Sequence, residues 1–375
     1  MTAKTFHILC LPGDGVGPEV IHEARQTLDL VASSRPVEFV WTEAAFGGAA
    51  IDAHGVPLRD EDADLAANSD SVLFGAVGGP KWENVAPEIR PEAGLLSLRH
   101  RLGLFANLRP IKVLDALVDA SPMKADIVRG TDLLIVRELI GGIYFGKPSE
   151  QMETSEGRSA VDTLLYSETE IERLIELGFE LAKGRRNKVT SVDKANVMAS
   201  SRLWRTIANE VAERHPDVDL EHALVDSCAM RLLLRPTDYD VMVMENMFGD
   251  ILSDEAAVLA GSLGMLPSAS LSGRKPTREG TSAVQFGMYE PIHGSAPDIA
   301  GQNRANPCGA ILSAAMMLRI SFSLDDEANA IESAVNATLE EGIRTADLPL
   351  PGAQPVGTTE FGEKVRGHLG RRLAD

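Results

Sequence analysis

Short apolar segments alternate with amphipathic ones along this chain, and that alternation limits its fold more than any other feature. The apolar runs at 7–11, 37–41, 71–77 and 132–138 have the length of strands. Segments with helical periodicity lie between such runs. A chain of this pattern buries its apolar faces by packing helices on a sheet. The sequence therefore predicts an α/β fold, and 375 residues are enough for two domains.

The charge balance restricts the partners. The chain has 36 Lys and Arg against 55 Asp and Glu, a formal net charge of −19. This charge disfavours nucleic acid and anionic membranes, although a local arginine cluster can still bind a small anion. Cys10, Cys228 and Cys308 form neither a disulfide framework nor a zinc-binding spacing. With no signal-like segment and no apolar run of bilayer length, we expect a cytoplasmic protein.

The first apolar run leads into a glycine-rich turn, 12–19, and then into a helix. Gly13 and Gly15 match the start of a dinucleotide-binding fingerprint, but Pro18 occupies the position of the third glycine. The lysine of a Walker A loop is also missing. A Rossmann-type cofactor site is therefore disfavoured here, and the glycines are interpreted as forming a sharp turn.

An acidic stripe follows the apolar run at 240–244. Asn246, Asp250 and Asp254 are four residues apart, so a helix places them on one face. Two carboxylates at this spacing repel each other unless a positive charge lies between them, and a hard divalent cation suits their oxygen ligands. The alternative is a solvated acidic face near a helix start. The stripe alone does not decide between these interpretations.

Several basic side chains lie in apolar surroundings. Arg99, Arg109 and Arg137 must each be paired or bound to an anion, and a guanidinium matches a carboxylate in bidentate geometry. Structural ion pairs are the alternative. Lys194 is predicted at the end of a strand, where loss of hydration can turn a lysine into a general base. An ordinary surface lysine is the alternative, and Asp226 is predicted to end another strand.

Three other segments are distinctive. The polar stretch 147–166 is predicted to be an arm or hairpin that reaches a partner chain. The stretch 268–285 is a glycine- and serine-rich basic excursion, and 289–301 is dense in turn-forming residues. Asn306 and Pro307 are predicted to open a long helix, with the asparagine as its cap.

Three motifs together resemble the isocitrate/isopropylmalate family of β-decarboxylating dehydrogenases. They are the turn at 12–19, the acidic helix at 248–254 and the loop at 293–298, in the family order and over nearly the whole chain. The resemblance implies a doubly wound α/β sheet of the family type, not a Rossmann domain. It implies a discontinuous cofactor-binding domain, 1–104 and 261–375, and a substrate and dimerisation domain, 105–260, with an active-site cleft between them. The arm at 147–166 would clasp the partner of a homodimer.

The resemblance also assigns roles to individual residues. Tyr144 and Lys194 would be the acid–base pair, and Arg99, Arg109 and Arg137 would bind the substrate carboxylates. Asp250 and Asp254 would hold Mg²⁺ or Mn²⁺ together with Asp226 from the other subunit. That subunit would also supply Lys194, and its Asp226 would lie beside the substrate as well. The NAD contacts would come from Glu92, His293, Gly294, Ser295, Ala296, Pro297, Asp298, Ile299 and Asn306.

Under this resemblance the expected reaction is oxidation of a 2-hydroxy acid followed by loss of CO₂. The metal would lower the pKa of the substrate hydroxyl and stabilise the enolate, Lys194 would accept the hydroxyl proton, and Tyr144 would protonate C3. Apolar Leu95, Leu96 and Val197 favour the isopropyl group of 3-isopropylmalate, with 4-methyl-2-oxopentanoate as product. Asp298 and Ile299 favour NAD⁺, because an aspartate repels a 2′-phosphate.

Other activities remain open at this stage. Within the family, homoisocitrate, D-malate and tartrate are alternative substrates. Outside it, the glycine-rich turn could belong to a phosphate-binding or kinase-like module, and the acidic stripe to a non-catalytic metal-binding regulator. Two features depart from the expected family pattern: the excursion at 271–287 with its basic residues, and Cys228, which we interpret as a small packed hydrophobic residue.

Overall fold

A computed structural model describes residues 3–374, which divide into two compact units. Of the described residues, unit 1 comprises 3–104, 114–122 and 260–374, and unit 2 comprises 105–113 and 123–259. The predicted division at 104/105 and 260/261 differs from this mainly in the segment 114–122, which groups with unit 1. That segment is attached there by Arg344, which bonds the carbonyl of Ala116 and the carboxylate of Asp119.

Unit 1 contains a mixed five-stranded sheet in the order β2-β1-β3-β12-β11. Its strands are β1 (Lys4–Gly13), β2 (Val37–Glu43), β3 (Ser71–Ala76), β11 (Pro267–Leu271) and β12 (Gly287–Pro291). All neighbours are parallel except β11 and β12, which pair antiparallel with Pro267 opposite Pro291. The antiparallel β11 departs from the order of a Rossmann sheet. This confirms the prediction of a non-Rossmann α/β fold.

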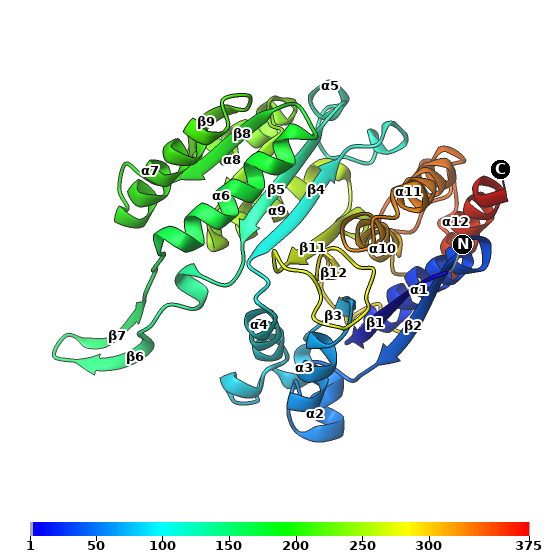
Figure 1. Ribbon diagram of the computed structural model, residues 1–375, viewed down its shortest axis with the longest axis horizontal. Coiled ribbons are helices and arrows are strands. Elements are labelled where there is room, and N and C mark those ends of the chain that lie inside the picture. Colours follow the sequence, from blue (N-terminus) through cyan, green and yellow to red (C-terminus); the bar gives the residue numbers. More distant parts are fainter. Residues whose placement is uncertain (1–2, 375) are drawn as a thin grey trace. The chain divides into compact units, whose positions relative to one another are not determined.

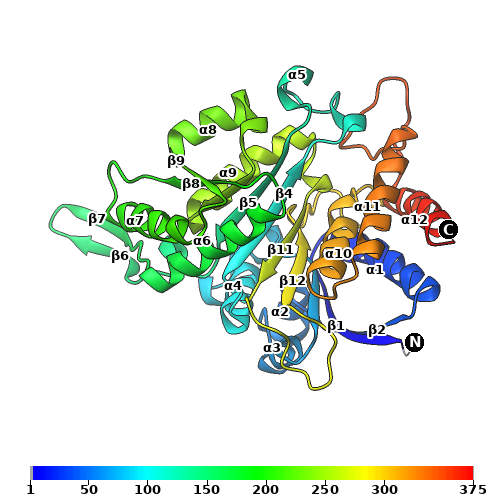
Figure 2. The same ribbon diagram turned by 45° about the horizontal axis from the view of Figure 1, so that its top comes forward.

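Helices pack on this sheet as the alternation predicts. Those of unit 1 are α1 (Gly17–Ser34), α2 (Gly48–His54), α3 (Asp60–Ala67), α4 (Pro91–Leu102), α10 (Cys308–Ile320), α11 (Asp325–Glu340) and α12 (Thr358–Ala374). Figure 2 shows α1 and α10 beside the sheet, with α11 and α12 next to them. The core between these elements is apolar and includes the stacked rings of Phe6 and Phe322, whose centroids are 4.0 Å apart.

One segment of unit 1 was predicted wrongly. The stretch from Ser268 was expected to begin an irregular excursion, but 267–271 form a fully buried strand, β11. Serines are tolerated there because their hydroxyls are bonded; Ser268 Oγ, for example, donates to the carbonyl of Glu290 at 3.0 Å. The irregular part therefore begins only after Leu271.

Five strands of unit 2 pair in the order β4-β5-β10-β8-β9, and β6 and β7 form a two-stranded hairpin. The strands are β4 (Ala106–Lys112), β5 (Asp132–Glu138), β6 (Ser149–Thr154), β7 (Gly157–Asp162), β8 (Lys188–Asp193), β9 (Asp219–Leu224) and β10 (Val241–Met244). The helices are α5 (Ala125–Val128), α6 (Glu168–Lys183), α7 (Ala199–Arg214), α8 (Val225–Leu234) and α9 (Asn246–Ala257). Strands β4 and β5 pair antiparallel, as do β6 and β7 of the hairpin, and the other described neighbours are parallel.

The helices of unit 2 cover the two faces of its sheet, with α6 and α7 on one face and α8 and α9 on the other (Figure 1). The central strands are buried on both faces, which explains their continuous apolar sequences. The polar stretch after Lys147 forms the β6–β7 hairpin, which projects from the rest of unit 2 (Figure 1).

Single-turn 3₁₀ helices complete the fold; they are Pro80–Trp82, Pro87–Ile89, Asp115–Leu117, Gly142–Tyr144, Pro236–Asp238, Val258–Ala260 and Leu263–Met265. All three cysteines are buried free thiols, and burial raises the pKa of Cys228 to about 11. The interpretation of Cys228 as a packed hydrophobic residue is therefore confirmed. Within residues 3–374, no helix combines the length and the apolar content needed to cross a membrane.

Candidate active site

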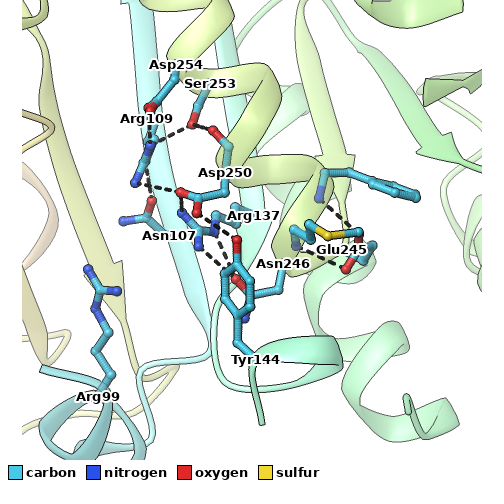
Figure 3. A network of polar contacts seen from close by, with 12 residues as sticks. Arg99, Asn107, Arg109, Arg137, Tyr144, Glu245, Asn246, Asp250, Ser253 and Asp254 are labelled. Carbon is cyan, nitrogen blue, oxygen red and sulfur yellow. Dashed lines mark hydrogen bonds and ion pairs between the residues drawn. The ribbon is translucent and has the colours of Figure 1, made fainter. Parts of the chain in front are cut away.

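The acidic stripe lies on α9, the helix that follows β10, and faces two arginines. The side chain of Glu245 caps α9 by accepting hydrogen bonds from the backbone N–H groups of Met247 and Phe248. Arg109 lies on β4 and Arg137 on β5, and Figure 3 shows both side chains pointing toward the acidic stripe of α9. The positive charge that the two carboxylates require is thus supplied within the chain.

Arg109 is buried and hydrogen-bonded to polar side chains of β4 and α9, and its Nη2 also lies 3.9 Å from Asp250 Oδ1. Its Nη1 donates to Ser253 Oγ at 2.6 Å and to Asp254 Oδ1 at 3.3 Å, and its Nε donates to Asn107 Oδ1 at 2.8 Å. Only 8% of Arg109 is exposed. Asn107 lies two residues before Arg109, so both side chains point from the same face of β4. Sequence analysis missed Asn107 and Ser253, although the two-residue spacing could have indicated Asn107.

Arg137 joins the first two residues of the stripe, Asn246 and Asp250. Its Nε and Nη2 donate to Asn246 Oδ1 at 3.0 and 2.9 Å, and its Nη1 forms an ion pair with Asp250. The guanidinium also lies 5.9 Å from the centre of the Tyr144 ring. Gly249 makes this approach possible, because a Cβ there would lie 2.5 Å from the Arg137 side chain. The structure therefore brings Arg137, Tyr144 and Asp250 together.

Tyr144 is attached to the stripe by its hydroxyl. The phenol donates to Asp250 Oδ2 at 3.0 Å, and the side chain remains partly exposed. Burial raises the pKa of Tyr144 to about 12, with the nearby Asp250 carboxylate as the next cause. The phenol therefore keeps its proton at neutral pH, which is the form that a proton donor needs.

The donor set of the stripe suits a hard divalent cation, but one chain gives only part of a site. Asp250 and Asp254 offer carboxylate oxygens whose side chains are 37% and 65% exposed. Among residues 3–374, no three His, Cys, Asp or Glu side chains cluster closely enough to hold a metal. The third predicted ligand, Asp226, was expected from a second subunit, and that expectation stays a prediction.

Lys194 and Asp226 form an ion pair with each other. Lys194 follows β8, and its Nζ lies 2.5 Å from Asp226 Oδ1. The hydrogen bond from Lys194 lowers the pKa of Asp226. The prediction that Asp226 ends a strand was wrong: β9 ends at Leu224, and Asp226 belongs to the first turn of α8. That turn leaves the carboxylate largely exposed.

Unit 1 carries the third predicted arginine. Arg99, on α4, forms an ion pair with Glu290 of β12 at 2.8 Å, while its buried Nε has no hydrogen-bond partner among the described residues. Leu95 and Leu96, on the same helix, are half-buried. The remaining member of the predicted apolar patch, Val197 of unit 2, is 67% exposed.

The predicted cofactor loop of unit 1 packs against the glycine-rich turn. The carbonyl of Ser295 accepts the N–H of Val16 at 2.8 Å. Gly15 has a φ of +58°, and a Cβ there would lie 1.9 Å from that carbonyl oxygen. The turn therefore supports the loop at 293–298, a role that explains its glycines without a Rossmann fingerprint.

In the loop at 293–298, the side chain of His293 is only partly hydrogen-bonded. His293 Nδ1 lies 2.8 Å from the carbonyl of Gly294, while its buried Nε2 has no partner among residues 3–374. Burial lowers the pKa of His293, which favours a neutral ring; because Nδ1 donates to the carbonyl, Nε2 can accept a hydrogen bond from a ligand. Gly294, Pro297 and Asp298 are exposed, and Ala296 and Ile299 are half-buried. An unpaired ring nitrogen beside exposed loop residues fits a bound nucleotide.

Both polar atoms of the Asn306 side chain form hydrogen bonds within unit 1. Its Nδ2 donates to Asp347 at 3.0 Å, and its Oδ1 accepts the N–H of Cys308, the first residue of α10. The prediction that Asn306 occupies the cap position and Pro307 the first turn was wrong by one residue, because Pro307 is at the cap position and α10 begins at Cys308.

Asp14 is a buried carboxylate whose role sequence analysis missed. It accepts the backbone N–H groups of Gly48, Ala49 and Gly78, each at 2.8 Å. These bonds join the turn after β1 to the start of α2 and to the loop after β3. Glu92, predicted to lie near the nicotinamide, adjoins that loop, because a Cβ on Gly78 would lie 2.5 Å from Glu92 Oε1. Asp14 thus supports the loop beside Glu92.

The basic excursion does not supply free arginines. Arg278 bonds both carboxylate oxygens of Asp70 at 3.1 Å, and Arg274 donates to the carbonyl of Leu102 at 3.1 Å. Asp70 immediately precedes β3, so this ion pair lies at the amino end of the strand. Ligands of α/β sheets bind at the carboxyl ends. The pair therefore anchors the excursion to the sheet.

Comparison with known proteins identifies the family of this chain. Residues 7–365 match the family model for isocitrate/isopropylmalate dehydrogenase. A 3-isopropylmalate dehydrogenase from Geobacillus kaustophilus is 56% identical over 361 residues, which cover 96% of this chain and 95% of that protein. One from Aquifex aeolicus is 50% identical over 372 residues, 99% of each chain.

Solved structures agree with this assignment. An isocitrate dehydrogenase from Methylococcus capsulatus is 31% identical, with a TM-score of 0.83 over 97% of this chain and 99% of that one. A β-decarboxylating dehydrogenase from Thermococcus kodakarensis is 35% identical, with a TM-score of 0.77 over 97% and 96% of the two chains. Fold and matches together define the chain as a dehydrogenase. It belongs to the isocitrate/isopropylmalate dehydrogenase family.

Proposed function

We propose that this protein catalyses the NAD⁺-dependent oxidative decarboxylation of (2R,3S)-3-isopropylmalate to 4-methyl-2-oxopentanoate, a cytoplasmic step of leucine biosynthesis. The observation that carries the proposal is the pair of buried arginines, Arg109 and Arg137, held against the Asp250/Asp254 stripe. Relatives at 50–56% identity that carry the name 3-isopropylmalate dehydrogenase support this choice of substrate.

In this proposal the arginines bind the two substrate carboxylates. A guanidinium has five N–H donors, so Arg109 and Arg137 can keep their contacts within the chain and still bond a ligand. Arg99 of unit 1 is the third carboxylate-binding arginine. Bound NAD⁺ supplies a hydride acceptor and Mg²⁺ or Mn²⁺ supplies positive charge for the developing enolate, with Asp250, Asp254 and the partner's Asp226 as the metal's carboxylate donors.

Proton transfers fall to Lys194 and Tyr144. In the proposed site Lys194 is contributed by the second subunit and takes the proton of the C2 hydroxyl as C2 is oxidised. Loss of CO₂ leaves a carbanion-equivalent at C3, and Tyr144 donates its phenolic proton there. The pKa of about 12 keeps this proton on Tyr144 until the strongly basic C3 forms. One proton leaves the substrate and one returns, so the acid–base balance closes.

The loop at 293–299 is the proposed NAD⁺ site. His293, whose Nε2 is buried and unpaired among the described residues, is the proposed contact for the adenosine half of the cofactor. Gly294, Ser295, Ala296, Pro297, Ile299 and Asn306 form the surrounding backbone and walls, and Glu92 lies towards the nicotinamide. The exposed carboxylate of Asp298 is suited to accept bonds from the ribose hydroxyls, and it would repel the 2′-phosphate of NADP⁺.

A homodimer is part of the proposal. Nearly all side chains of the β6–β7 hairpin are exposed, and an isolated two-stranded hairpin is marginally stable in water. Helices α8 and α9, which pack on each other, expose the apolar side chains of Met230, Leu234 and Ile251 by 60–66%. A second copy of the chain would cover both surfaces.

The test is NADH formation across a substrate panel. We expect the highest specificity constant with 3-isopropylmalate and NAD⁺, and lower values with homoisocitrate, D-malate, tartrate and isocitrate. Arg137→Lys should reduce this activity strongly, since lysine loses the bidentate geometry. Arg185→Lys is the matched control, because Arg185 pairs with two carboxylates of unit 2, Asp132 and Asp240. Faster turnover of isocitrate, or a preference for NADP⁺, would contradict the assignment.

A further inference from the structure

Directly behind Arg137, two buried glutamates face one tyrosine hydroxyl. Glu138, the last residue of β5, is fully buried, and Glu245, before α9, is 5% exposed. Tyr166, at the end of the polar stretch that forms the hairpin, is 6% exposed. Its Oη lies 3.4 Å from Glu138 Oε2 and 3.4 Å from Glu245 Oε2. The hydroxyl is therefore equidistant from two carboxylates.

Counting hydrogens shows what this arrangement requires. The Tyr166 hydroxyl has one hydrogen to donate and two lone pairs that accept. One lone pair takes the backbone N–H of Asn246 at 3.0 Å. The hydrogen can serve only one carboxylate at a time, and a proton on the other carboxylate would let it donate to the second lone pair. With one proton held on the glutamates, every polar atom of the group is satisfied; with none, two buried anions face each other.

The surroundings assign the proton to Glu138. Glu245 accepts two backbone N–H groups at the start of α9, where the helix dipole stabilises an anion. Glu138 accepts N–H groups of Ile140 and Gly141, and the nearest cation is Arg173 of α6, at 3.5 Å. The negative charge of Glu170, also on α6, acts against Arg173 by raising the pKa of Glu138. Burial raises the pKa of both carboxyls, that of Glu138 to about 7; at Glu245 the N–H groups of Phe248 and Met247, followed by Tyr166 and Arg137, act against this rise.

This buried group supports two of the proposed active-site residues. Asn246, which Tyr166 holds through its N–H, accepts two bonds from Arg137 and donates to the carbonyl of Gly141 at 3.0 Å. The turn that carries Tyr144 begins at Gly142, which has a φ of +74°. A Cβ on Gly142 would lie 2.3 Å from Tyr166 Oη, so the turn packs directly against the tyrosine.

We propose that Glu138, Tyr166 and Glu245 form a one-proton network of positioning residues that holds Arg137 and Tyr144 in their reactive arrangement. The inference rests on the proposed roles of Arg137 and Tyr144. Ionisation of Glu138 places a second negative charge against the Glu245 carboxylate and loosens the turn at 141–144. Because Tyr166 ends the hairpin segment, the network also joins the base of the hairpin to the site.

Two variants test the network through the kinetics of the full-length enzyme. Tyr166→Phe removes the shared hydroxyl, and we expect kcat/KM with isopropylmalate to fall at least ten-fold. Glu138→Gln replaces the acid by an amide that cannot ionise. An amide nitrogen at the position of Oε2 donates to Tyr166 but no longer accepts the N–H of Gly141, so we expect lower activity than wild type near pH 6, and the readout is the pH dependence. As pH rises through 7, the ratio of the Glu138→Gln rate to the wild-type rate should increase, because only the wild type loses its network proton.

Tyr289→Phe is the matched control, since Tyr289 is buried in unit 1 and its hydroxyl bonds Ser321 at 2.8 Å. If Tyr166→Phe loses no more activity than Tyr289→Phe, or the Glu138→Gln ratio is constant with pH, the network is refuted. Should Tyr166→Phe fail to fold, the pH dependence of Glu138→Gln decides alone. Failure of the proposed function is distinguishable, because it would appear as an inactive wild type or a fully active Arg137→Lys.

Discussion

Stability should depend on pH through Glu138, and Glu138→Gln should abolish that dependence. The carboxyl is fully buried in the fold, where its pKa is raised from 4.5 to about 7 by burial. Below about pH 4.5 the group is protonated in both states, and its contribution to the free energy of unfolding is complete. Between about 4.5 and 7 the folded state binds the extra proton, so stability falls as pH rises; above about 7 the contribution is lost. The window of about 2.5 units, at about 1.4 kcal/mol per unit, corresponds to roughly 3 kcal/mol.

Trp204 provides a local probe for this measurement. It is 2% exposed and packs edge-on against Tyr166, with ring centroids 6.0 Å apart. In a background of Trp41→Phe and Trp82→Phe, its fluorescence reports the unfolding of unit 2 in urea at fixed protein concentration. The difference in unfolding free energy between wild type and Glu138→Gln should change by roughly 3 kcal/mol from pH 4.5 to 7 and then level off. Glu172→Gln, an exposed change on α6, is the control. A difference that does not vary with pH would mean that Glu138 is ionised throughout, and the reasoning would fail.

Three further predictions concern the proposed reaction. Asp250→Asn should lower kcat at least about a hundred-fold, because a metal ligand contributes several kcal/mol to transition-state stabilisation; exposed Asp217→Asn should not, and full activity after chelation of divalent metals would contradict the metal role. Mixing inactive Lys194→Ala chains with inactive Asp250→Asn chains should restore part of the activity, since one hybrid site regains both groups; demonstrated subunit exchange without recovery would place each site in one chain. Burying the three isopropyl carbons at about 0.8 kcal/mol each favours isopropylmalate over D-malate by roughly 50-fold, so Leu95→Ala should shrink this preference and spare malate turnover, whereas an equal loss for both substrates would show that Leu95 only packs α4.

Local patterns were sufficient to predict most elements of the fold. The apolar run 132–138 became β5 with the predicted bounds, and the spacing of Asn246, Asp250 and Asp254 placed them on one face of α9. Such signals depend on periods of two or four residues within one segment, which the chain itself fixes. The strand β11 was missed because its two serines and one proline resemble a turn. Their polar atoms are satisfied by residues more than 20 positions away, including Glu290 and Ser313.

The arginines of the site show where local reasoning reaches its limit. Burial among apolar residues correctly indicated that Arg109 and Arg137 must be paired, but not with which residue. Ser253 and Asp254 are 144 and 145 positions from Arg109, and no spacing rule connects them. Of the two alternatives left open by the sequence, the structural ion pairs are present, and the substrate clamp stays a prediction that is compatible with them. Buried guanidiniums oriented by carboxylates of the same chain are already in place when an anionic ligand arrives.

The residues behind the site were invisible for a further reason: each has an ordinary local explanation. Glu245 is a helix cap, Glu138 ends a strand, and Tyr166 precedes a capping box at Ser167. Only the packing of β5, α6 and α9 brings their three oxygens to 3.4 Å. A pair of buried carboxylates that face one hydroxyl is costly unless the group binds a proton. Sites of this kind are therefore found by counting donors and acceptors in the folded chain, and the count here leads to a proton that no motif specifies.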